Sequence, residues 1–164
     1  MSESIEQFLD ETARRGSWIG GGSLAALSGA LSAALLEKLT PAPRAARRLR
    51  RIRRACAGLI QRDAETFAKV IDATRAKRPR AFQRSLQRAT DVQVTVSVNS
   101  RRIERACRRA RRAIKPRFQS DLQCALALAV AAQRSASALI RTNLAWLGNP
   151  AYAVSVRRRL RSQR

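Results

Sequence analysis

The sequence predicts an all-α protein, a single-domain helical bundle of five to six helices around a central buried helix. Strong helix formers dominate the 164 residues, and the few Gly and Pro residues fall between periodic apolar stretches. Aromatic residues make up only 4%, which argues against an all-β sandwich. Hydrophobic residues make up 45%, so one domain of this length can bury a core.

Capping signals, glycines and prolines divide the chain into its expected helices. Ser4 and Gln7 have capping-box spacing, as do Ser120 and Gln123, while Ser23 follows three glycines. The expected helices span residues 4–14, 23–39, 44–74, 81–114 and 120–147, followed by a short final helix. Residues 1–150 would form the helical domain, and residues 151–164 the final helix and a basic tail that frays.

Two of these helices need a separate argument. The segment 23–39 is almost wholly small and apolar, so it should lie at the centre of the bundle with no polar face for water. The alternating valines of Val92–Val98 are typical of a strand. Helical periodicity continues on both sides of them, so we predict the interior of the fourth helix.

The chain is strongly basic, with 34 Lys and Arg against 11 Asp and Glu, a formal charge of +23. Only four of these cations are Lys, and much of the Arg content could reflect codon composition. Such a charge attracts polyanions, so nucleic acid and an acidic small-molecule tail are both candidate ligands.

The sequence has no His, which excludes a His general base, a Ser-His-Asp triad and every His-containing metal site. Cys56, Cys107 and Cys124 show no metal-ligand spacing, so we predict no metal and three buried thiols in a reducing cytoplasm. The N-terminus does not have the pattern of a signal peptide. The apolar stretch Leu24–Leu36 is shorter than the ~20 residues of a membrane span, so we expect a cytoplasmic protein without a membrane.

Asp63 is the main irregularity in the pattern. The third helix carries apolar residues at steps of three and four, and Asp63 lies on that stripe between Leu59 and Phe67. Burying an unpaired carboxylate costs several kcal/mol. The sequence therefore predicts either a buried Asp–Arg pair or a pocket carboxylate with a shifted pKa.

Two helix starts are candidate binding elements. Gly20, Gly21 and Gly22 would let the backbone adopt positive φ and approach a ligand, with Ser23 capping the helix that follows. On this motif alone, a tight turn with an ordinary cap is the favoured interpretation, because isolated glycine motifs are weak signals. Ser120 and Asp121 also fit an ordinary cap and helix dipole, while Arg141 and Asn143 add polar groups further along.

In order, GGGS, DAETF, SDLQ and TNL resemble the motifs of the cyclodeaminase domain of formiminotransferase-cyclodeaminase and of related methenyltetrahydrofolate cyclohydrolases. The resemblance spans about Ile5–Leu147. It implies an all-helical folate one-carbon enzyme that is a homodimer or higher oligomer, with sites near a subunit interface. The substrate would be a tetrahydrofolate derivative, polyglutamylated in some forms, and no cofactor would be bound permanently.

The resemblance also implies roles for particular residues. Asp63 matches the family's catalytic aspartate and would transfer protons as N10 attacks the formimino carbon and ammonia leaves, or as water opens the methenyl ring. We expect the folate to be bound by Gly20, Gly21, Gly22, Ser23, Ser120, Asp121 and Asn143, with its glutamate carboxylates held by Lys115, Arg117 and Arg141.

The sequence departs from the family pattern at several positions. Ile19 and Gln93 replace prolines, and Lys115 and Arg117 stand in a segment that the family fills with small polar residues. The alternative is therefore a non-catalytic relative on the same scaffold, which binds nucleic acid through its Arg-rich surface without sequence-specific readout. Turnover of a folate, against salt-dependent DNA binding without turnover, separates the two hypotheses.

Overall fold

A computed structural model describes residues 4–161, which contain only helices and their connections. The helices are α1 (Ile5–Ala13), α2 (Gly21–Leu39), α3 (Pro43–Arg75), α4 (Pro79–Ala110), the 3₁₀ turn η1 (Pro116–Phe118), α5 (Gln119–Leu147) and α6 (Pro150–Arg161). The predicted all-α bundle is confirmed. Residues 162–164 of the predicted basic tail lie outside the described residues.

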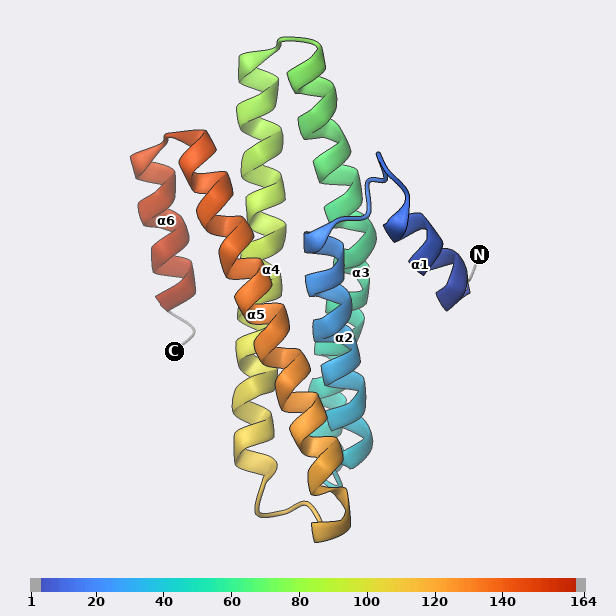
Figure 1. Ribbon diagram of the computed structural model, residues 1–164. Coiled ribbons are helices and arrows are strands. Elements are labelled where there is room, and N and C mark those ends of the chain that lie inside the picture. Colours follow the sequence, from blue (N-terminus) through green and yellow to red (C-terminus); the bar gives the residue numbers. More distant parts are fainter. Residues whose placement is uncertain (1–3, 162–164) are drawn as a thin grey trace.

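The four longest helices form the body of the molecule. α2, α3, α4 and α5 alternate in direction, and the α3–α4 hairpin extends beyond the start of α2 (Figure 1). α2 packs against each of the other three, as its small apolar composition predicts. Leu24 and Leu31 remain 36% and 50% exposed, so one stripe of α2 is uncovered in the single chain.

Small side chains allow α2 and α5 to approach closely. Ala26 and Ala33 of α2 are fully buried, as are four alanines one turn apart on α5: Ala125, Ala129, Ala132 and Ala136. The Ser32 hydroxyl donates across this contact to the Ala125 carbonyl at 2.6 Å. This buried hydroxyl is thus paired without widening the seam.

The valine-rich segment lies inside α4, as predicted. Val92, Val94 and Val96 are all buried because α4 is covered on several sides, by α3, α2, α5 and α6. Tertiary packing here outweighs the strand preference of valine.

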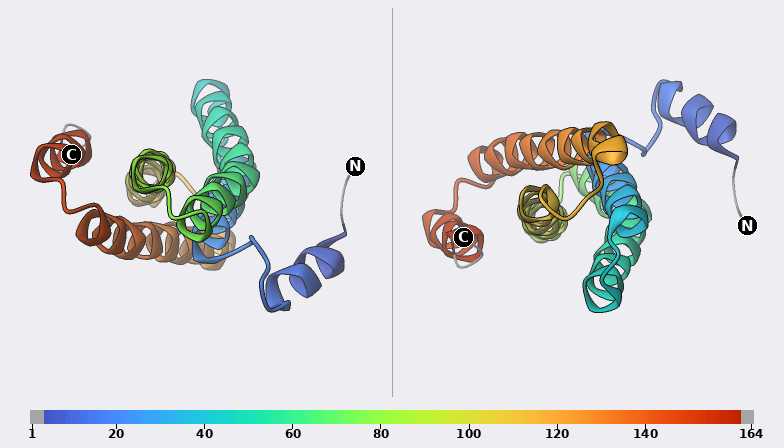
Figure 2. Two further views of the ribbon diagram at one scale, coloured as in Figure 1. Left: turned by 90° about the horizontal axis from the view of Figure 1, so that it is seen from above. Right: turned by 90° about the horizontal axis from the view of Figure 1, so that it is seen from below.

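The two terminal helices lie outside the body, on different sides (Figure 2). α6 packs on α4 through the buried Val156, and the Tyr152 hydroxyl donates to the Gln87 carbonyl at 2.9 Å. α1 has its predicted Ser4–Gln7 capping box, but none of its residues is buried and Ile5 and Leu9 are 81% and 57% exposed. Its apolar face is therefore uncovered within the chain.

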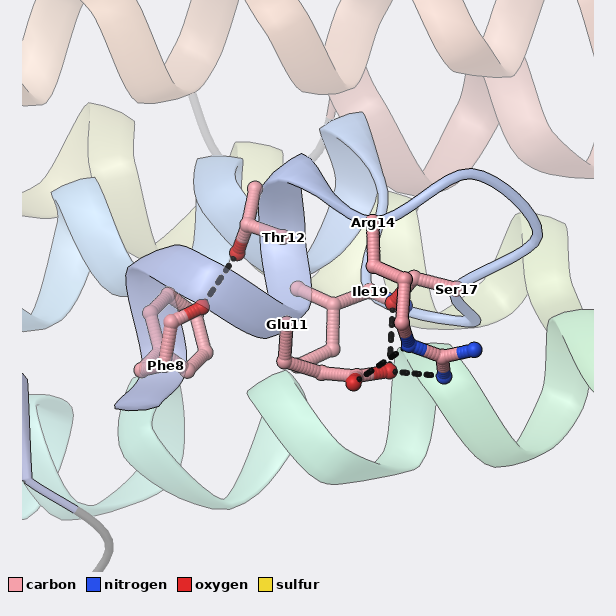
Figure 3. Close-up of polar contacts among 6 residues, drawn as sticks. All are labelled: Phe8, Glu11, Thr12, Arg14, Ser17 and Ile19. Carbon is pink, nitrogen blue, oxygen red and sulfur yellow. Dashed lines mark hydrogen bonds and ion pairs between the residues drawn. The ribbon is translucent and has the colours of Figure 1, made fainter. Parts of the chain in front are cut away.

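A polar turn connects α1 to the glycine segment (Figure 3). Glu11 accepts from the Arg14 guanidinium at 2.7 and 2.9 Å and from the Ser17 hydroxyl at 2.9 Å. Ser17 in turn accepts the Ile19 N–H at 3.1 Å. These bonds fix the path of the chain where it enters the glycines.

Several predicted helix boundaries are wrong. α2 begins at Gly21, and α5 begins at Gln119; neither has a side-chain cap, so Ser23 and Ser120 are not the caps. The Gln119 amide instead donates to the Arg111 and Ile114 carbonyls, which ties the start of α5 to the end of α4. α4 ends at Ala110.

The structure changes two further expectations: that all three thiols are buried, and that the apolar segments are too short to span a membrane. Cys124 is exposed, whereas Cys56 and Cys107 are buried as predicted. The segment Pro116–Leu147 is long and apolar enough to cross a membrane, a test that core helices of soluble proteins also pass. In this fold its alanine face is packed against α2 and α4.

Candidate functional site

Asp63 lies at the meeting point of α2, α3 and α4, with 8% of its surface exposed. Its Oδ2 accepts from the Ser23 hydroxyl at 3.0 Å, and its Oδ1 accepts from the Gln93 Nε2 at 2.6 Å. The third helix thus contributes the acid, and its two neighbours contribute one hydrogen-bond partner each.

Asp63 also occupies the N-terminus of α2. The backbone N–H of Ser23 also helps to lower the pKa of this carboxyl, in addition to the hydrogen bond from the side chain. Ser23 is the third residue of α2, where the N–H has no partner within the helix. A helix start favours a negative charge, and here that charge is the chain's own carboxylate, supplied from 40 residues away.

Burial raises the pKa of Asp63 above its ordinary value, because removal from water disfavours the charged form. The hydrogen bonds from Ser23 and Gln93 act in the opposite direction and offset part of this effect. No arginine forms an ion pair with Asp63 among residues 4–161. The predicted alternative of a buried Asp–Arg pair is wrong.

Of the three consecutive glycines, Gly22 is the one that the packing requires. A Cβ atom there would lie 2.3 Å from Asp63 Oδ1 and 2.3 Å from Gln93 Nε2, whereas Gly20 and Gly21 have open space. None of the three has positive φ, contrary to the prediction. The glycine is needed so that the carboxylate can approach the backbone of α2.

Asp63 borders a small apolar cavity of about 170 Å³. The glycine turn and Gln93 form one side of it, and partly exposed aromatic rings of Trp18, Phe67 and Trp146 form the rim. The remaining lining residues are Leu86, Ala89, Leu139, Thr142 and Asn143. The cavity combines flat apolar surfaces with one buried acid, a combination common in small-molecule sites.

The structure gathers only some of the predicted binding residues. The three glycines, Asp63 and Asn143 line the cavity, whereas Ser120 lies 23 residues before Asn143 on the same helix. At about 1.5 Å per residue these two positions are about 35 Å apart. Within one chain, the expected pocket between the glycine turn and Ser120–Asp121 therefore does not form.

The predicted cations also lie elsewhere. Lys115 and Arg117 precede α5 at the distal end, where the Arg117 guanidinium lies 4.8 Å from the Phe118 ring centroid. Arg141 lines a separate groove between α5 and α6, beside Ile140 and Val156. None of the three borders the cavity at Asp63.

Sequence reasoning missed the contributions of Gln93 and of the aromatic rim. Gln93 is 1% exposed although it is polar, and its helical spacing from Ala89 and Val96 could have indicated a buried position. Trp18 and Trp146, the two tryptophans of the chain, lie in the cavity wall. Their partners are distant in sequence, so no local pattern marks them.

The site has the chemistry of a proton-transfer group in an apolar pocket. No group of three or more metal-ligating side chains occurs within residues 4–161. The acid that borders the cavity is Asp63, and its surroundings raise its pKa toward the range useful for general acid–base catalysis.

Comparison with known proteins agrees with this geometry. The family model described as formiminotransferase-cyclodeaminase matches residues 4–162. The chain belongs to this family. The fold is also similar to the crystal structure of a formiminotetrahydrofolate cyclodeaminase from Thermotoga maritima, with a TM-score of 0.88 and 20% identity. That match covers 98% of this chain and 88% of the other, and at this identity it establishes the fold. No curated protein matches the sequence.

Family membership confirms the resemblance that the four motifs indicated. Three of them lie in well-separated parts of this member's fold: the glycine turn at the start of α2, Asp63 on α3 and Asn143 near the end of α5. The bundle nevertheless brings these three together in one cavity wall.

Proposed function

We propose that the protein is a folate one-carbon enzyme that converts 5-formiminotetrahydrofolate to 5,10-methenyltetrahydrofolate with release of ammonia, or hydrolyses the methenyl compound. The observation that carries this proposal is the buried Asp63 bordering an apolar cavity, with its pKa raised and no cation of residues 4–161 paired to it. Membership of the family supplies the substrate class.

Asp63 would act as the shuttle for one proton. In the cyclisation, N10 attacks the formimino carbon and forms the second C–N bond of a five-membered ring. The formimino nitrogen enters protonated, so after the attack it is a neutral amine. Asp63 accepts the proton that N10 loses and passes it to this amine. The carbon–nitrogen bond to the amine then breaks, ammonia leaves with the bonding pair, and the methenyl ring keeps the positive charge. The carboxylate ends in its starting state, so the reaction needs no other base.

The cavity fits one end of such a substrate. Its volume of about 170 Å³ is below the roughly 300–1,000 Å³ of a pocket that encloses a drug-sized ligand. The reacting ring would lie against the aromatic rim near Asp63, and the rest of the folate would extend beyond the cavity. We propose no permanently bound cofactor and a cytoplasmic location.

A second copy of the chain would complete this site. We propose a homodimer or higher oligomer, because Ile5, Leu9, Leu31 and Trp146 are exposed apolar side chains at least half uncovered in the single chain. A partner could also bring its own Ser120–Asp121 segment to the glycine turn. Light scattering should give at least twice the monomer mass of 18.2 kDa; a monomeric mass at micromolar concentration contradicts the oligomer.

Mixed oligomers test whether the site is shared between copies. Copies carrying Asp63→Asn are refolded with copies carrying Asp121→Asn. If the two residues act in one site across the interface, about a quarter of wild-type activity should return in an equal mixture of dimers. No recovery, with mixed dimers shown to form, would indicate that each site belongs to one chain.

The decisive test is turnover of the formimino and methenyl substrates side by side, followed by the methenyl absorbance. We expect activity on one of them, and a loss of about 10²–10⁴-fold in Asp63→Asn with folate binding retained. Full activity of the variant would overturn the role of Asp63. Binding without turnover in the wild type would identify a non-catalytic relative.

The non-catalytic alternative has one specific observation in its favour. Two arginine runs, far apart in sequence, meet at the end of the bundle where α2 finishes (Figure 1). Arg48 from α3 and Arg102 and Arg109 from α4 line one cavity of about 290 Å³ there. The runs comprise Arg44, Arg47, Arg48, Arg50, Arg51, Arg53 and Arg54, and Arg101, Arg102, Arg105, Arg108, Arg109, Arg111 and Arg112.

Nucleic acid is the polyanion that this cationic end would bind. Glu37 neutralises part of the charge through Arg50 and Arg53, and most of the arginines remain in excess. Binding of a short DNA duplex should weaken steeply with salt, with a slope of about −0.9 per phosphate contacted on logarithmic axes. Binding that is insensitive to salt, or absent at low salt, removes this alternative.

A further inference from the structure

The two side chains that hold Asp63 share an unusual chemical property. A serine hydroxyl and a glutamine amide can each donate a hydrogen bond or accept one, whereas Arg, Lys and backbone N–H groups only donate. Ser23 and Gln93 are 0% and 1% exposed, so their hydrogen-bond partners are protein groups rather than bulk water. This cavity wall can therefore pair with a carboxylate and also with a carboxylic acid.

On the Oδ2 side, a second acceptor for the Ser23 hydroxyl is already in place. Ser23 Oγ lies 3.0 Å from Asp63 Oδ2 and 3.1 Å from the Ile60 carbonyl, and the hydroxyl has only one hydrogen. When Asp63 is ionised, that hydrogen points to Oδ2. When Oδ2 carries a proton, Asp63 can donate to Ser23 Oγ while the hydroxyl turns to Ile60.

On the Oδ1 side, Gln93 has a second polar atom that can accept a hydrogen bond. Its Nε2 donates to Oδ1 at 2.6 Å, and its Oε1 is buried with no hydrogen-bond partner among the residues that the structure describes. An unpaired buried carbonyl costs free energy, which native structures generally avoid. A half-turn of the amide would present Oε1 to a protonated Oδ1, so the same side chain serves both states.

We propose that Ser23 and Gln93 are positioning residues that hold the Asp63 carboxyl in one place in both of its protonation states. The inference rests on the proposed role of Asp63 as a proton shuttle, since a group that takes and returns one proton must keep its position throughout. Gln93 acts through Asp63 and is not itself assigned a proton.

The described charged groups around Asp63 do not explain what holds its carboxyl in one position. From α2 it faces the Ser23 hydroxyl and N–H, and from α4 the Gln93 amide, none of which titrates near neutral pH. Its charged neighbours on α3, Arg62 and Glu65, are exposed. Among the described residues that line the cavity, the one with a charged side chain is therefore Asp63.

The test compares Gln93→Met and Ser23→Ala with wild type. Met has nearly the length of Gln without its hydrogen bonds. We expect kcat to fall at least about tenfold in each variant while KM changes less than about threefold, because binding surfaces stay and the position of the acid is lost. Each variant removes a donor to the charged form, so the pKa of Asp63 should rise and the acidic limb of the pH–rate profile should move to higher pH.

A matched control separates positioning from stability. Ser32 lies nine residues after Ser23 on α2 and is also fully buried. Its hydroxyl donates to the Ala125 carbonyl. Ser32→Ala should lower the melting temperature about as much as Ser23→Ala and leave both kcat and the pH profile unchanged. Equal kinetic losses in the control and in Ser23→Ala would overturn the proposal.

A readout without turnover keeps this inference distinct from the proposed function. The Asp63 carboxyl carbon can be assigned by NMR from its absence in Asp63→Asn, and wild-type crystals can be compared on either side of its titration. We expect one carboxyl position at both pH values. A carboxyl that swings away from Ser23 or Gln93 when protonated refutes the positioning role, whether or not the folate reaction is found.

Discussion

A methyl group on Gly22 would lie 2.3 Å from the Oδ1 atom of Asp63. The start of α2 and the acid of α3 are thus in contact at a distance that leaves no room for any side chain. Gly22→Ala should displace Asp63 or Gln93, lower the free energy of unfolding by about 1–3 kcal/mol and reduce turnover at least about tenfold.

The adjacent glycine provides the control for this prediction. A Cβ on Gly21 meets no atom within 4 Å, so Gly21→Ala should leave stability close to wild type and keep Asp63 in its position. Urea titrations and initial rates measured on both variants make the comparison. Equal effects at the two positions would show that flexibility of the turn, rather than its contact with Asp63, limits the site.

The raised pKa of Asp63 predicts how stability depends on pH. The folded protein holds the proton of Asp63 more tightly than the unfolded chain, whose aspartate has its ordinary pKa of 3.8. Wild type should therefore lose stability relative to Asp63→Asn as pH rises from below 3.8 through the folded pKa, and the difference should then level off.

Paired urea titrations of the two proteins from about pH 3 to pH 7 measure this difference. Taking it at each pH cancels the contributions of the other acids. A wild type that gains stability over the variant as pH rises would mean that the pKa is lowered on folding, contrary to the burial of the carboxyl.

The seam between α2 and α5 predicts a sharp contrast between two neighbouring alanines. Ala132 is fully buried and lies under Gly29 of α2, whereas Ala131 is exposed. Ala132→Leu should destabilise the protein by about 1–3 kcal/mol because the helices must separate. Ala131→Leu should change stability by less than about 0.5 kcal/mol. Thermal unfolding of both variants tests the register of this seam.

The three cysteines should differ in reactivity. Burial raises the pKa of Cys56 and of Cys107 to about 11 in each case, and Cys124 is exposed. A thiol reagent at neutral pH should modify one cysteine rapidly in the native protein and all three in denaturant. Cys124→Ser should abolish the rapid reaction. Fast modification of Cys56 would instead reveal opening of the α2–α3 contact.

Local and periodic features of the sequence were enough to predict the fold and one central residue of the site. The Ser4 capping box is confirmed because its two residues satisfy each other within one turn. Asp63 stood out because helical spacing alone placed a carboxylate on a buried face. Val92–Val98 was correctly assigned because the flanking periodicity outweighed its strand-like composition.

The remaining features depend on contacts that no local pattern contains. Ser23 has the residue type and spacing of a cap, yet its hydroxyl bonds to α3, 40 residues away. Ser120 loses its capping role because η1 and the Gln119 amide already close the start of α5. Gln93 enters the site only through the relative register of α3 and α4.

The carboxylate that sits at the start of α2 also links the assembly of the bundle to the completion of the site. Gly21–Leu39 has no side-chain cap of its own, so an isolated peptide of this segment would lack the acceptor that Asp63 places at its first turn. That acceptor arrives when α3 docks, and the same event places the acid beside the glycines. The same contact of α3 with α2 would then stabilise the first turn of α2 and complete the reactive centre, so a chain that had collapsed without it would have neither.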